Sequence, residues 1–184
     1  VSFDASLKSH KAGSRKNIQA HYDLGNDFYQ LFLDKTLTYS CGYQIEDNDT
    51  LEQMQLQKYE LICQKLALKP DENIVDFGCG WGGMLIYAAE NYGITGTGIT
   101  LSQEQANLAK ERIEQRGLCD RLKIVVSDYR EVTGQYDKFV SIGMFEHVGE
   151  GNFEIFTNKV SEILKPQGIG LLHTIGTVGR AGRD

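Results

Sequence analysis

A glycine-rich segment, residues 75–83 (VDFGCGWGG), is the part of the sequence best suited to hold a ligand. It follows a short apolar run, and glycines at such a strand-to-helix turn let the backbone approach a ligand at a helix N-terminus, where the amides point outward. Gly78, Gly80 and Gly83 satisfy the G-x-G-x-x-G spacing of dinucleotide-binding enzymes. The glycines alone therefore indicate a nucleotide-type cofactor without deciding which one.

Acidic residues near this loop help to choose the cofactor. A dinucleotide site wants an acid about 20 positions further on, but the next expected strand ends in Thr100 and no acid follows before Glu104. Asp76 instead lies two residues before the first glycine, Gly78, where a carboxylate would repel a pyrophosphate but can pair with an ammonium group. This favours S-adenosylmethionine (SAM), with its methionine moiety, over NAD. An aspartate that only caps the turn is the structural alternative.

Glu146 and His173 are two further titratable residues near the carboxyl ends of expected strands. Ligands of doubly wound sheets collect at that edge. Taken alone, however, Glu146 fits an exposed helix start and His173 fits a hydrogen-bonded core histidine, so by themselves they indicate no particular chemistry.

The elements that position these residues divide into two parts that join near Asn73. The earlier part is predicted to be helical, with a short aromatic-rich piece at 26–34 and a longer helix at 50–68 that Pro70 closes. Thr50 and Gln53 have the spacing of a capping box. The apolar residues spaced for the buried face of the longer helix are Leu51, Met54, Tyr59, Ile62 and Leu66.

From Asn73 onward, short apolar runs alternate with longer amphipathic ones, which is typical of βαβ units and a parallel sheet. Ser102 and Gln105 have a second capping-box spacing, and Gly168 with Gly170 is expected to fix the turn into the last strand. The sequence predicts strands at 73–77, 94–99, 122–127, 136–142 and 168–175, and helices at 82–92, 102–116 and 152–164.

Charge and cysteine content limit the possible partners. The chain of 184 residues has a net charge of −6, which argues against a nucleic-acid partner. Residues 1–20 carry four basic residues against one acidic residue, a net +3, which suits an anionic membrane surface or a solvated terminus. The four cysteines form no CxxC pair and no metal-ligand spacing, which fits a reducing cytosol. No apolar run approaches the roughly 20 residues of a membrane span.

Six motifs in order resemble the cyclopropane fatty acid synthases and the related mycolic acid cyclopropane synthases, which are SAM-dependent methyltransferases. The likeness extends from about Arg15 to Gly176. The glycine loop alone would indicate only a methyltransferase, whereas the combination is far more specific. The motifs are HYDLGNDFY at 21–29, LTYSC at 37–41, the glycine loop, GITLS at 98–102, SIGMFEHVG at 141–149 and LLHTI at 171–175.

The resemblance implies an α/β fold, a doubly wound Rossmann-like class I SAM-dependent methyltransferase sheet preceded by N-terminal helices. Such a sheet has seven strands, so with five expected strands the chain is predicted to be truncated at its C-terminus. Residues 1–72 would form a helical lid and acyl-pocket segment. Residues 73–184 would form the SAM-binding part, and both together would make one structural domain.

The resemblance also implies which residues contact SAM. Gln105 has a structural alternative as the capping partner of Ser102, and one side-chain amide cannot fill both roles. The implied contacts are Tyr39 and Ser40 at the methionine end, Asp76, Gly78, Cys79, Gly80, Trp81 and Gly82 beneath the cofactor, Thr100, Leu101 and Gln105 at the ribose, and Asp128, Tyr129 and Arg130 at the adenine.

For an alkene acceptor, methyl transfer from the sulfonium of SAM leaves a carbocation, and closing a cyclopropane ring requires a base that removes a proton from the new methyl group. The resemblance implies that this base is a bound bicarbonate ion. Its holders, the expected catalytic residues, would be the backbone of Cys41 and Ile142 and the side chains of Glu146 and His173. A carboxylate beside an anion is acceptable if a proton bridges them or if His173 is charged. His147 and His21 are interpreted as structural or lid residues.

The implied function is transfer of a methyl(ene) group from SAM to the cis double bond of an unsaturated phospholipid acyl chain, forming a cyclopropane fatty acyl chain. Open alternatives are a methyltransferase that makes a methyl-branched lipid or methylates a small molecule, and a SAM- or lipid-binding fragment without catalysis. We expect a cytoplasmic enzyme, peripherally associated with the membrane, with a homodimer as a further expectation.

Overall fold

The computed structural model describes residues 25–176, so the basic segment 1–20, His21 and the closing residues 177–184 lie outside the described part. The elements, in chain order, are α2 (Asn26–Gln30), α3 (Leu51–Leu66), β1 (Asn73–Phe77), α4 (Gly83–Tyr92), β2 (Thr95–Thr100), α5 (Gln103–Gln115), β3 (Leu122–Val126), η1 (Tyr129–Glu131), β4 (Tyr136–Ile142), η2 (Phe145–His147), η3 (Glu150–Asn152), α6 (Phe153–Ile163) and β5 (Leu164–His173).

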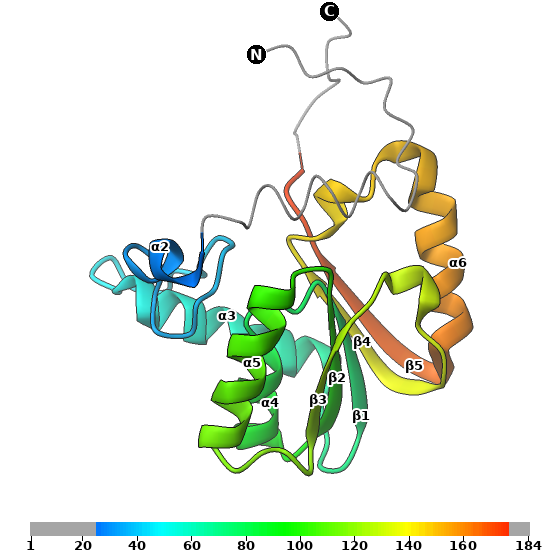
Figure 1. The fold of residues 1–184 in the computed structure, drawn as a ribbon, viewed down its shortest axis with the longest axis horizontal. Coiled ribbons are helices and arrows are strands. Elements are labelled where there is room, and N and C mark those ends of the chain that lie inside the picture. The colour runs from blue at the N-terminus through cyan, green and yellow to red at the C-terminus, as the bar shows by residue number, and fades with distance from the viewer. Residues whose placement is uncertain (1–24, 177–184) are drawn as a thin grey trace, which may run out of the picture.

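The five strands form one parallel sheet in the order β3-β2-β1-β4-β5. Helices α3, α4 and α5 cover one face and α6 covers the other, as Figure 1 shows. The strand order reverses at β1, which pairs with β2 on one side and with β4 on the other. Ligands of doubly wound sheets bind beyond the carboxyl ends of the strands at this switch point. The predicted fold class is confirmed.

Strand β1 is buried on both faces because its side chains alternate between two cores. Ile74 belongs to the cluster under α3, α4 and α5, whereas Val75 and Phe77 belong to the cluster under α6. A strand covered on both sides reads as a continuous apolar run. Asp76 is the exception in this run, and its burial on a central strand needs a separate explanation.

The last strand differs from its predicted bounds. Residues 168–175 were expected, but β5 begins at Leu164, directly after α6. Its register with β4 is irregular between the pairs Tyr136–Leu164 and Lys138–Ile169, and Gln167 within this stretch has φ 67°. Gly168, which was expected to help fix a turn before the strand, therefore belongs with Pro166 to a bulge inside it, where the ladder is interrupted.

Helix α3 confirms the predicted capping box. Thr50 N donates to Gln53 Oε1 at 2.8 Å, and Gln53 N donates to Thr50 Oγ1 at 3.3 Å. Its buried face differs from the prediction, because Leu51 is exposed while Gln55 and Lys58 are buried. Apolar spacing could not identify polar residues on a buried face.

Helix α2 is shorter than the predicted piece at 26–34. The chain leaves the helix after Gln30, and the carboxylate of Asp34 then accepts hydrogen bonds from the backbone N–H of Thr36 at 2.9 Å and of Thr38 at 3.0 Å. A short acidic side chain that binds following backbone amides stabilises a turn in competition with a helix. Within residues 25–176, no helix is long and apolar enough to cross a membrane.

Candidate functional site

A cavity lies at the switch point, beyond the carboxyl ends of β1, β2 and β4. It holds about 970 Å³ of empty space, a volume that includes open solvent. Of the predicted site residues, those that line it are Tyr39, Ser40, Asp76, Gly78, Cys79, Gly80, Trp81, Thr100, Leu101, Gln105, Tyr129 and Ile142. Gly82, Asp128, Arg130, Cys41, Glu146 and His173 are not among the lining residues.

The glycine loop forms the floor of this cavity. Gly78, Gly80 and Gly82 all have positive φ, the region that favours glycine. A Cβ on Gly78 would lie 2.6 Å from the Cβ of Met144, so the loop also packs too closely against the segment after β4 for a side chain to fit. The loop is therefore fixed by sterics on one side and open to a ligand on the other.

Asp76 is the unusual group of this floor. It is 2% exposed, burial raises the pKa of its carboxyl to about 7, and its Oδ1 has no hydrogen-bond partner among the described residues. A buried acceptor without a partner is costly. Because Asp76 lines the cavity, a ligand that brings a cation or a donor would satisfy it.

Thr100 and Gln105 form the wall beside β2. Thr100 Oγ1 donates to Gln105 Oε1 at 2.9 Å, while Ser102 Oγ caps α5 by accepting from Gln105 N at 3.2 Å. The cap uses the backbone of Gln105 and not its side chain, so the two predicted roles of Gln105 do not compete. Its side-chain amide remains directed to Thr100 at the cavity wall.

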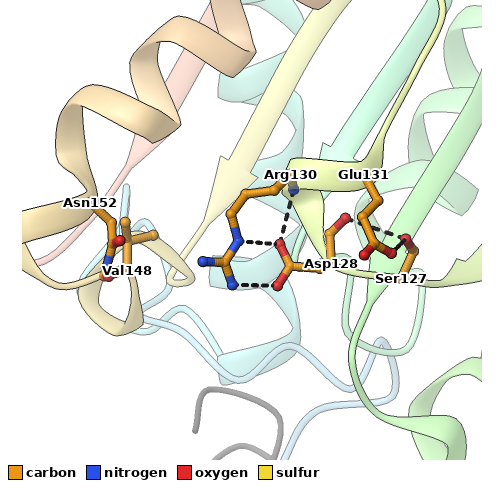
Figure 2. Close-up of polar contacts among 6 residues, drawn as sticks. All are labelled: Ser127, Asp128, Arg130, Glu131, Val148 and Asn152. Atoms are coloured by element: carbon orange, nitrogen blue, oxygen red, sulfur yellow. Dashed lines mark hydrogen bonds and ion pairs between the residues drawn. The ribbon is translucent and has the colours of Figure 1, made fainter. Parts of the chain in front are cut away.

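The predicted adenine contacts separate in the structure. Tyr129 lines the cavity and packs its ring 5.7 Å from that of Phe77. Asp128 and Arg130 instead pair with each other, because Arg130 Nε and NH2 reach the two carboxylate oxygens at 2.8 Å and 2.6 Å (Figure 2). The bidentate pair holds η1 in place, and only Tyr129 of the three faces the cavity.

The four predicted catalytic residues are linked by contacts around the end of β5, although only Ile142 among them lines the cavity. Ile142 lines it and is the register partner of His173 on the neighbouring strand. Cys41 Sγ lies 3.6 Å from His173 Nε2. Glu146 is exposed, and its Oε1 accepts from Ile175 N at 2.8 Å. The structure therefore gathers Cys41, Ile142 and His173 and places Glu146 nearby.

The surroundings of His173 lower the pKa of its imidazole. Burial lowers the pKa of its imidazole, the positive charge of Lys58 lowers it further, and Glu146 opposes the shift. One ring nitrogen of His173, Nε2, lies near Cys41 Sγ, and the other, Nδ1, is buried without a partner among the described residues.

Sequence reasoning missed several residues of this region. Met144 and His147 line the cavity, although His147 was assigned a structural or lid role. Lys58 and Gln55 reach the segment that carries Ser40 and Cys41. The motif around residues 141–149 could have indicated His147, but a lysine and a glutamine within an ordinary helix pattern give no such signal.

The chain has the fold of the Rossmann-like SAM-dependent methyltransferases. Its features are a parallel sheet, a glycine loop after the first strand and a cavity at the switch point. The chain belongs to the mycolic acid cyclopropane synthetase family, whose model matches residues 9–183.

Among relatives, the cyclopropane-fatty-acyl-phospholipid synthase of Escherichia coli K12 is 48% identical over 157 residues, covering 85% of this chain and 40% of that protein. The structure of the cyclopropane synthase MmaA2 from Mycobacterium tuberculosis superposes with a TM-score of 0.85 at 36% identity, covering 92% of this chain and 58% of the other. Mycolic acid cyclopropane synthase CmaA1 complexed with SAH and CTAB gives a TM-score of 0.82 at 37% identity, covering 86% and 55%. The chain thus spans about half the length of these proteins.

Proposed function

We propose that this chain forms the SAM-binding part, and one side of the acceptor site, of an enzyme that transfers a methylene group from SAM to the cis double bond of an unsaturated phospholipid acyl chain, forming a cyclopropane ring. The observation that carries the proposal is the unpartnered buried carboxylate oxygen of Asp76 beside the glycine loop of a cavity at the switch point. Membership of the cyclopropane synthetase family supports the acceptor.

The residues present fit SAM. Asp76 would receive its ammonium group directly or through a water, and Gly78, Gly80 and Gly82 would let its methionine part approach the backbone. Thr100 and Gln105 would bind the ribose hydroxyls, with Leu101, Cys79 and Trp81 as further walls. Binding of SAH by the related CmaA1 supports this assignment. When bound, SAM supplies an electrophilic methyl group on its sulfonium.

Tyr39 and Ser40 would cover the methionine end, and Tyr129 would lie at the adenine. The ion pair between Asp128 and Arg130 argues that these two residues support Tyr129 rather than contact the cofactor themselves. The protein's task with a reactive methyl donor is to align the acceptor and to exclude water. The apolar rings around Trp81 suit that task.

We further propose that bicarbonate serves as the general base, held by the backbone of Cys41 and Ile142 and by the side chains of Glu146 and His173. The unpartnered Nδ1 of His173, and the cation that lowers its pKa, support an anion at this place. When bound, the ion would accept the proton that leaves the added methyl group. Glu146 can share a proton with such an anion, since two neighbouring acids do not both ionise readily.

The acceptor being a phospholipid, we propose a cytoplasmic enzyme that contacts the membrane peripherally and associates as a homodimer. The net charge of +3 on residues 1–20 supports attraction to an anionic leaflet. Sedimentation with anionic and with neutral phospholipid vesicles tests the contact, and equal binding to both would contradict an electrostatic one.

The decisive experiment compares Glu146→Gln with Glu150→Gln, a nearby exposed control. Glu146→Gln should lower ring formation on unsaturated phospholipid by about 100-fold while the Kd for SAM stays near wild type. Products are identified by NMR of the cyclopropane protons, because a methylated alkene has the same mass as the ring. Ring formation by Glu146→Gln at the wild-type rate would remove Glu146 from the base site, and methylated alkene from the wild type would favour the methyl-branching alternative.

A further inference from the structure

Residues 40–43 begin at Ser40 on the cavity wall and make repeated contacts with α3. Gln55 Nε2 donates to the carbonyl oxygen of Ser40 at 2.8 Å, and Tyr43 N donates to the carbonyl oxygen of Met54 at 2.9 Å. A Cβ on Gly42 would lie 2.6 Å from the Cβ of Met54, so the two backbones are in direct contact. The position of this segment is therefore set by α3.

Lys58 makes the central contacts of this attachment. Its Nζ donates to Ser40 Oγ at 2.6 Å and to the carbonyl oxygen of Cys41 at 2.9 Å, and its side chain is 3% exposed. In a trans peptide the N–H points opposite to the carbonyl. Since the carbonyl of Ser40 is turned toward α3 by Gln55, the N–H of Cys41 is turned away from the helix. This is the backbone group proposed to hold the anion.

The charge of Lys58 lacks an ionic partner. Both of its hydrogen-bond acceptors are neutral, and none of the ion pairs among residues 25–176 includes Lys58. A buried ammonium group without a paired carboxylate is unfavourable. An anion in the neighbouring site would relieve that cost.

The titratable groups that interact with Lys58 come from the segment before α3 and from β5. Asp34 and Cys41, from the segment before α3, act to raise the pKa of Lys58, but burial dominates and lowers it to about 8. On β5, His173 has its own pKa lowered by the charge of Lys58, with Glu146 opposing. The charge of Lys58 is therefore coupled electrostatically to the neighbouring titratable groups.

We propose that Lys58 is a positioning residue of the anion site: it fixes the Ser40–Cys41 segment so that the Cys41 amide faces the ion, and its positive charge, which forms no ion pair among the described residues, attracts that ion. This inference rests on the proposed function, in which bicarbonate is the base. Lys58 acts through the backbone of Cys41 and through its charge, and it does not touch the reacting atoms.

The test compares Lys58→Met with Lys65→Met, which removes an exposed lysine from the same helix. In the full enzyme, the Kd for ¹³C-labelled bicarbonate is measured by NMR titration and the Kd for SAM by calorimetry. Lys58→Met should raise the bicarbonate Kd by about 10-fold or more, and the SAM Kd by less than about threefold. Lys65→Met should change neither. Because Lys58→Met removes a neighbouring cation, it should also raise the pKa of His173, which NMR can measure.

A second measurement uses the wild-type enzyme and does not depend on whether a variant folds. With ¹³C-labelled lysine, saturating bicarbonate should raise the pKa of Lys58 above its value of about 8, because a neighbouring anion favours the ammonium form. An unchanged pKa overturns the inference, as does a wild-type bicarbonate Kd in Lys58→Met. If wild-type enzyme binds SAM but no bicarbonate, the proposed base itself fails; if it binds both and Lys58 has no effect, only the role of Lys58 fails.

Discussion

Trp81 Nε1 donates a hydrogen bond of 2.7 Å to Oδ1 of Asn26, joining the glycine loop to the first turn of α2 across 55 residues of sequence. The ring of Tyr29 packs 5.0 Å from that of Trp81, and Arg112 donates to the carbonyl oxygen of Trp81 at 2.6 Å. The floor of the cavity and the segment beside it are thus one connected unit.

Replacing Asn26 by Ala should lower the free energy of unfolding by about 1 kcal/mol, because the Trp81 N–H loses this acceptor in a partly buried place. Urea denaturation measures the change. Asn48→Ala, at an exposed position, is the control and should stay within about 0.5 kcal/mol of wild type. Equal stability of the two variants would show that the contact contributes nothing.

Asp76 should make stability depend on pH. Between the pKa of an unfolded aspartate, 3.8, and its folded value of about 7, the native state holds a proton that the unfolded chain has lost. The contribution of Asp76 therefore falls as pH rises through this window and is constant above it, with a total of roughly 4 kcal/mol. We expect the free energy of unfolding of the wild type to fall relative to that of Asp76→Asn as pH rises from 4 to 7. Above pH 7 the two free energies should change with pH in parallel. Parallel curves throughout would contradict the raised pKa.

SAM binding near pH 7 should release protons. The ammonium group of the ligand favours the ionised form of Asp76 and so lowers its pKa from about 7. Calorimetric titrations in buffers of different ionisation enthalpy report the number of protons released, and Asp76→Asn should release fewer. Proton uptake by the wild type would place a different group at the ammonium.

Gln105 and Ser102 should separate cofactor binding from helix capping. Ser102→Ala removes the oxygen that accepts from Gln105 N and should lower stability by about 1 kcal/mol with little change in SAM affinity. Gln105→Met keeps the capping amide and should weaken SAM binding by about 10-fold, the equivalent of one lost polar contact. The reverse pattern would assign Gln105 a purely structural role.

Much of the fold could be predicted because periodicity and turn chemistry are local. The sheet, the capping box of Thr50 and the glycine turn all follow from short stretches of sequence. The predicted start of β5 was wrong because Gly168 marks a bulge as readily as a turn, and only the pairing with β4 distinguishes the two. The prediction that Leu51 is buried was wrong because spacing alone does not show how much of a helix face is covered.

The residues of the candidate site that lie within a sequence motif could be predicted. Those that depend on tertiary contacts could not. The loop around Gly78 and the wall at Thr100 lie where their motifs placed them. The motif does not show, however, that Asp128 and Arg130 form an ion pair with each other. The role proposed for Lys58 depends on the folding of a distant segment onto α3, which no local pattern encodes.

The contact between Cys41 and His173 joins positions 132 residues apart, whereas Gly80 and Gln105 are 25 residues apart. Contacts so distant form late, because a large part of the chain must be ordered before they exist. During synthesis, the proposed methyl-donor pocket can take shape once β4 and the segment that follows it are in place, while the proposed anion pocket must wait for β5. A nascent enzyme of this design would be able to hold its methyl donor before it could finish a ring.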